Sequence, residues 1–169
     1  MNKTRRNLQV VCAILLSLLA LRPLGAGDHE ISVRVLKIKG SGKAEPGAKP
    51  VVDDKLSSVK SKLESLPFGH ARYDAIPDPE VKRGAAGALL TFDLPHGRQL
   101  EVQAKRGTSN KIELHLRVTR EDERKKVRAE VVSIDTQVDD GDAIIQKSDI
   151  RLDEGGSLLY AVTASTRPL

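Results

Sequence analysis

The sequence predicts an α+β fold: a mostly antiparallel β-sheet, arranged as a meander, with one amphipathic helix packed on one face. Between Leu89 and Val131, apolar and polar residues alternate in four successive segments, which is the pattern of strands with one buried face. One segment, residues 52–66, instead repeats its apolar residues at intervals of three and four, as a helix does. Packing that helix on the apolar face of the meander would bury both patterns in one core.

The first 26 residues have the pattern of a secretory leader. Basic residues precede an apolar run from Val10 to Leu21, which as a helix is about 18 Å long, too short for a hydrocarbon core of about 30 Å. Small residues favour cleavage after Ala26, which leaves a single domain over residues 27–169. We therefore expect an exported protein, periplasmic or extracellular. The general secretory route and the twin-arginine route, suggested by "TRRNLQ", both remain open, as does retention of the leader as an anchor.

Removal of the leader changes the cysteine content and the charge. Cys12, the single cysteine, leaves with it, so the mature domain depends on its core rather than on disulfides. Four of the 28 basic residues leave as well, and the remaining 24 oppose 23 acidic residues, a net charge near +1. This balance gives no support to a nucleic-acid partner. The mature chain is also expected to hold no transmembrane segment, cofactor or metal.

The first half of the domain is predicted to contain a strand, a loop and the helix. Alternation over residues 31–35 predicts the strand, and residues 40–50, rich in Gly, Pro and Lys, predict a mobile loop. Asp53 is placed to cap the helix and Pro67 to end it. The apolar stripe of the helix consists of Val52, Leu56, Val59, Leu63 and Leu66.

The second half is predicted to be almost entirely β. A short strand is expected around Tyr73, followed by an irregular loop over residues 77–87, where two prolines and two glycines occur. The turns of the meander are "LPHG", "GTSN" and "REDERKK", so His96 is interpreted as an exposed turn residue. Two or three more strands follow, punctuated by "DDGD" and "DEGG".

Two resemblances accompany this pattern. The run "DTQVDDGDAII", residues 135–145, resembles the C-terminal β-hairpins of the secretin domain of bacterial outer-membrane channels, although "QKS" stands where that motif usually closes with two glycines. The whole layout, from the leader to "GGSLLYAVTA", resembles a loose group of small exported bacterial proteins of unassigned function. These resemblances imply an envelope setting and transfer no functional residues.

Two functional hypotheses follow. The first is a non-enzymatic periplasmic or envelope module that binds another envelope protein or itself, as a component of an export or surface machine, because an antiparallel sheet edge can accept a strand. A basic band would contact the partner or an acidic surface, unless it is only a solvated hairpin, as its interspersed carboxylates suggest. The band comprises Arg117, Arg120, Arg124, Lys125, Lys126 and Arg128.

The second hypothesis is a small hydrolase or metal-dependent protein with a site assembled from His70, Asp74 and His96. No ligand spacing such as His-x-x-x-His and no nucleophile motif supports it. With two Phe, two Tyr and no Trp, the chain also lacks material for stacking on sugars or bases. The binding module is therefore the preferred interpretation, with no catalytic residue assigned.

Overall fold

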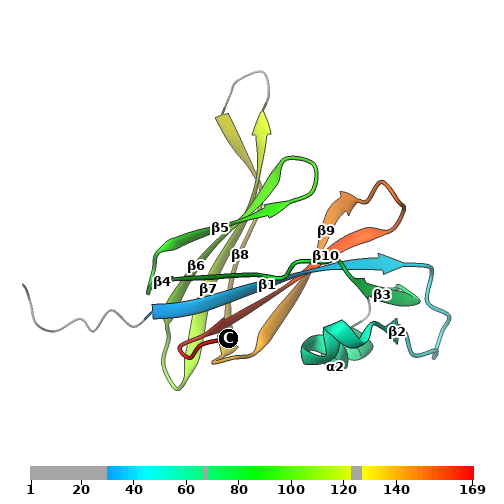
Figure 1. Cartoon of the computed structure of the whole chain (residues 1–169), viewed down its shortest axis with the longest axis horizontal. Helices are drawn as coiled ribbons and strands as arrows, with labels where there is room; N and C mark the ends of the chain where they lie inside the picture. Colours follow the sequence, from blue (N-terminus) through cyan, green and yellow to red (C-terminus); the bar gives the residue numbers. More distant parts are fainter. Residues whose placement is uncertain (1–29, 67, 123–126) are drawn as a thin grey trace, which may run out of the picture.

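The computed structural model describes residues 30–66, 68–122 and 127–169, which form two β-sheets and one short helical segment (Figure 1). The first sheet has six strands, with β1 at its centre, and the second has four. The elements of the first sheet are β1 (Glu30–Ser41), β2 (Val51–Val52), β3 (Arg72–Ala75), β4 (Glu80–Ala85), β9 (Ala143–Arg151) and β10 (Ser157–Ser165). Those of the second are β5 (Leu89–Leu94), β6 (Arg98–Arg106), β7 (Lys111–Asp122) and β8 (Val127–Asp139).

The four-stranded sheet is the predicted meander. Its order is β5-β6-β7-β8, and every pair is antiparallel. A β-bulge at Val131 interrupts the β7–β8 register, because Val118 faces Val132 and the next residue, Thr119, faces Glu130. His96 has a φ of 59° and lies between β5 and β6, so its predicted place in a hairpin turn is confirmed.

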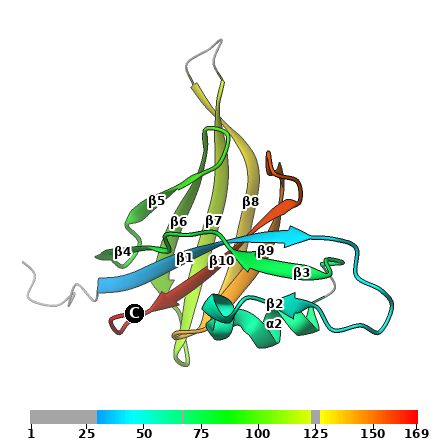
Figure 2. The same cartoon turned by 45° about the vertical axis from the view of Figure 1, so that its right-hand side comes forward.

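The meander buries its apolar face against the first sheet. Phe92, Leu100 and Leu116 from the meander share one core with Val33 of β1 and Tyr160 of β10. Figure 2 shows the two sheets packed as layers that cross. The main core is therefore built from strands of both layers, without the helix.

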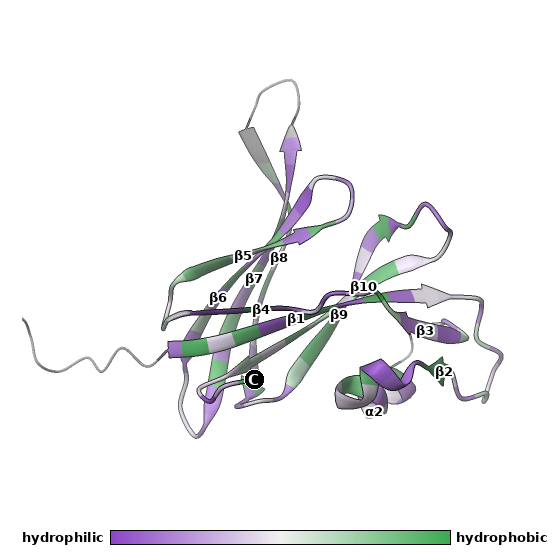
Figure 3. Cartoon of the chain, viewed as in Figure 1, coloured by the Kyte–Doolittle hydropathy of each residue, from purple (hydrophilic) through white to green (hydrophobic). Residues whose placement is uncertain are grey.

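The helix packs on the opposite face of the first sheet, so the prediction that it covers the meander is wrong. It consists of a 3₁₀ segment η1 (Asp54–Val59) and α2 (Lys60–Ser65), which is shorter than the predicted stripe. Leu56, Val59 and Leu63 are buried against Leu159 and Ala161 of β10. Figure 3 shows that the helix carries both hydrophobic (green) and hydrophilic (purple) residues. Because β10 is apolar on both faces, it supplies one face to each core.

The local helix signals agree with the structure in part. The carboxylate of Asp53 accepts a hydrogen bond from the backbone N–H of Lys55 at 3.0 Å, as expected of an N-cap. Val52 belongs to β2, and Leu66 is 40% exposed. Pro67, the expected stop, lies outside the described residues.

Part of the segment predicted to be an irregular loop is the strand β4. It pairs with the first half of β1, while β3 pairs with the second half. Most side chains of β4 are exposed, so no apolar alternation marks the strand. Of the predicted loop 40–50, residues 40 and 41 still belong to β1. The expected leader lies outside the described residues, and none of the described helices is long and apolar enough to span a bilayer.

Candidate interaction surface on the four-stranded sheet

The two edge strands of the meander differ in whether side chains bind the backbone groups that have no neighbouring strand. β5 forms one edge, and two lysines of the other sheet reach its carbonyl oxygens. The ammonium group of Lys37 donates to Asp93 O at 3.2 Å, and that of Lys82 donates to Thr91 O. Lys82 also lies 5.1 Å from the centroid of the Phe92 ring. The β5 edge is thus covered by cations, a common way to prevent further strand pairing.

The β8 edge is open. In the part of the chain that the structure describes, this 13-residue strand pairs with β7 alone. Val131 and Val132 at the bulge are 37% and 43% exposed. A long edge strand with exposed valines combines unpaired backbone groups with apolar surface, which is the requirement for accepting another strand.

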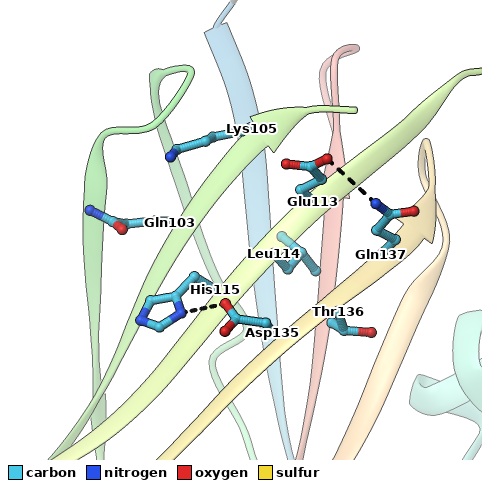
Figure 4. Close-up of a pocket in the computed structure, with 8 residues that line it drawn as sticks. All are labelled: Gln103, Lys105, Glu113, Leu114, His115, Asp135, Thr136 and Gln137. Carbon is cyan, nitrogen blue, oxygen red and sulfur yellow. Dashed lines mark hydrogen bonds and ion pairs between the residues drawn. The ribbon is translucent and has the colours of Figure 1, made fainter. Parts of the chain in front are cut away.

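A polar hollow of about 530 Å³ lies on the outer face of the meander beside this edge (Figure 4). The Nδ1 atom of His115 lies 2.6 Å from Oδ1 of Asp135, and the amide of Gln137 donates to Glu113 at 3.4 Å. Both pairs bridge β7 and β8, because their residues are direct cross-strand neighbours. Gln103, Lys105, Leu114 and Thr136 complete the lining.

The next row of the same face holds a more buried ion pair. The Nε atom of Arg117 donates to the carboxylate of Glu101 at 2.7 Å, and a second guanidinium nitrogen also bonds to it. The side chain of Glu101 is 9% exposed, against 40% for Arg117. The guanidinium of Arg117, one of the residues expected to contact a partner, is therefore paired with Glu101 within the sheet.

The rest of the basic band is only partly described. Arg120 is exposed on β7, where it faces Arg98 of β6 across the strand pair. A hydrogen bond from Arg98 lowers the pKa of Asp149, and the charge of Arg120 lowers it further. Residues 124–126 lie outside the described residues, and of Arg128 only the backbone is described, as part of β8.

The residues proposed for the alternative site are distributed over two faces. Asp74 and Pro95, the neighbour of His96, line one cleft of about 500 Å³. His70 packs edge-on against the ring of Tyr73, with centroids 5.9 Å apart. Since Tyr73 and Asp74 are consecutive on β3, they point to opposite faces, and His70 lies on the face away from Asp74.

Asp74 and His96 have hydrogen-bond partners outside the proposed site, and His70 is partly buried. Asp74 accepts a hydrogen bond from Nε of Arg72 at 2.7 Å, and Nε2 of His96 lies 3.0 Å from the carbonyl oxygen of Arg151. Burial lowers the pKa of His70, so its ring is neutral at neutral pH. Among the described residues, no group of three or more His, Cys, Asp or Glu side chains is arranged to hold a metal ion.

Known proteins show only a weak structural likeness to this chain. No protein-family model matches the sequence, and neither does any curated protein sequence. A structural likeness links the chain to the InvG secretin domain β-barrel from the Salmonella SPI-1 injectisome NC-base, with 13% identity and a TM-score of 0.31. The match covers 83% of this chain and 63% of that chain, so it spans less than two thirds of the InvG domain. At this TM-score the likeness defines neither the fold nor the function of the chain.

Proposed function

We propose that the chain is an exported envelope protein that acts as a non-enzymatic binding or assembly module, as a component of an export or surface machine. The observation that carries this proposal is the contrast between the two edges of the meander. Lysines cover the free edge of β5. In the described part of the chain, the edge of β8 that points away from β7 has no strand paired with it. A partner strand would extend the sheet at β8 through backbone hydrogen bonds.

The exposed valines support the same edge. On β8, Val131 and Val132 remain accessible at the bulge. An added strand would remove their apolar surface from water, which contributes roughly 25 cal/mol for each Å² buried. Binding would therefore combine directional backbone pairing with a small apolar contact.

Site-directed photocrosslinking in the native cells tests the proposal. A photoreactive residue at Ser133 of β8 is expected to give a defined protein adduct, whereas one at Thr108, in the β6–β7 turn, is expected to give none. The adduct should disappear when Val132→Asp places a charge at the edge, and persist with Val81→Asp, where the valine is 45% exposed on β4. Equal adducts from Ser133 and Thr108, or an adduct insensitive to Val132→Asp in a folded variant, would reject β8 as the binding edge.

A further inference from the structure

We infer that the strand accepted by β8 alternates apolar and basic residues, with its basic side chains on the outer face beside Asp135 and Asp139. This inference rests on the proposed function and adds the chemistry of the partner. It follows from how the regular part of β8, residues 132–139, distributes its side chains between the two faces of the sheet.

The inner face of this segment belongs to the core. Val132, Ile134, Thr136 and Val138 pair with Val118, Leu116, Leu114 and Ile112 of β7. Cross-strand partners in an antiparallel pair share a face, so all eight lie on the side of the first sheet. Val132 is 43% exposed, and Ile134 and Ile144 are half-buried at the border of the core. Apolar side chains of an added strand would cover these three residues.

The outer face carries a different chemistry. Ser133, Asp135, Gln137 and Asp139 pair with Arg117, His115, Glu113 and Lys111. The carboxylate-bearing side chains of Asp135 and Asp139 are 86% and 69% exposed. On β7 their partners are His115, 2.6 Å from Asp135, and Lys111, 3.6 Å from Asp139, and both carboxylates stay largely accessible beside the open edge. Lys or Arg at alternate positions of an added strand would complement them.

A second copy of this chain fits the edge less well. Residues 132–139 contain no basic side chain. If two copies of this segment paired in an antiparallel way, the outer face would oppose only Ser, Asp and Gln residues, and registers that place Asp against Asp are destabilised by like charge. Charge complementarity therefore favours a different, basic strand.

A displayed library of random nine-residue peptides, selected on the purified full-length chain, tests the inference. We expect selected sequences with alternating apolar and basic residues. Their affinity, measured by fluorescence anisotropy, should fall about threefold to tenfold with Asp135→Asn/Asp139→Asn, as expected for the loss of two cross-strand charge pairs. It should not change with Asp153→Asn/Glu154→Gln, which removes two carboxylates that are 93% and 88% exposed in the β9–β10 loop.

The outcomes separate the inference from the proposed function. Affinity lost with Val132→Asp but unchanged with Asp135→Asn/Asp139→Asn would overturn the basic partner and keep strand addition at β8. Affinity unchanged with Val132→Asp would reject the proposed edge itself. Selected peptides without basic residues, or a Val132-dependent dimer of the chain in sedimentation, would also overturn the inference, the latter in favour of a second copy. Circular dichroism would show that each variant is folded.

Discussion

The Nζ atom of Lys37 on β1 lies 3.2 Å from the backbone carbonyl oxygen of Asp93 on β5, and thus joins the central strand of one sheet to the edge of the other. The same ammonium group contacts Glu80 of β4 at 2.9 Å. One lysine therefore satisfies an edge carbonyl and a carboxylate, and occupies the space that an incoming strand would need.

Removing the two edge lysines should make the protein self-associate. In Lys37→Met/Lys82→Met, the carbonyl oxygens of Asp93 and Thr91 lose their donors, and β5 becomes a second open edge. We expect concentration-dependent dimers or larger species in sedimentation velocity. Lys39→Met is the matched control, because Lys39 pairs with the exposed Glu154. If the double variant and the control behave alike, the lysines do not protect the edge.

The ion pair between Glu101 and Arg117 should be asymmetric in its effect on stability. Arg117→Met leaves a carboxylate buried without its main partner, and should lower the free energy of unfolding by about 2–3 kcal/mol. Glu101→Met leaves a guanidinium that water can reach, and should cost about 1 kcal/mol. Urea denaturation measures both, with Glu113→Met as an exposed control within about 0.5 kcal/mol of wild type. A larger loss for Glu101→Met than for Arg117→Met would contradict this account.

Tyr160 should make the protein less stable at alkaline pH. Burial raises the pKa of its phenol to about 12, with a further contribution from the charge of Asp149, against about 10 in an unfolded chain. The folded state thus disfavours the phenolate. Below pH 10 the free energy of unfolding is not affected by this ionisation. As the pH rises from about 10 to 12, the free energy of unfolding falls, by roughly 2–3 kcal/mol in full.

Tyr160→Phe removes this ionisation and tests its contribution. The free energy of unfolding of the variant, measured by urea denaturation between pH 8 and 11, should fall less steeply above pH 10 than that of wild type. Tyr73→Phe is the comparison at the other tyrosine, whose pKa burial also raises. Parallel curves for wild type and Tyr160→Phe would show that the phenol does not contribute.

Gly40 should not tolerate a side chain while His70 is present. A Cβ at this position would lie 2.5 Å from Cδ2 of His70 and 2.8 Å from Cδ1 of Leu159. Gly40→Ala should therefore lower the free energy of unfolding by about 1–3 kcal/mol. In a double-mutant cycle, Gly40→Ala should lower the free energy of unfolding less in the His70→Ala background than in wild type, because the clash with His70 is gone. Additive costs would exclude a direct contact between the two positions.

Periodicity predicted the meander because each of its strands buries one face, as Leu100 and Val102 do on β6. β4 was missed because most of its side chains are exposed, so the residues around Val81 show no alternation of apolar and polar types. The layer order was missed for a different reason. The run from Leu158 to Ala164 is apolar at nearly every position, which is typical of a strand buried on both faces, and this was a signal for a second layer.

The candidate surface could be predicted from the sequence only in part. Because His115 alternates with the apolar residues of its strand, the sequence predicts that its side chain faces solvent, and in the structure the side chain is 40% exposed. Its contact with Asp135, 20 residues away, depends on the register of the β7–β8 pair. The contact of Glu101 with Arg117 likewise depends on the register of the β6–β7 pair. A one-residue shift would separate both pairs, and the bulge at Val131 produces such a shift within β8.

The position of β10 between the two cores also constrains the order in which the protein can fold. Leu158 and Tyr160 complete the core between the sheets, whereas Leu159 and Ala161 complete the core under the helix. β10 pairs with β1 along nine residues, although more than 100 residues separate the two strands in the chain. During synthesis, neither core can close before this strand has emerged from the ribosome. We therefore expect the nascent chain to stay incompletely folded, and accessible to chaperones, until nearly all of it has been made.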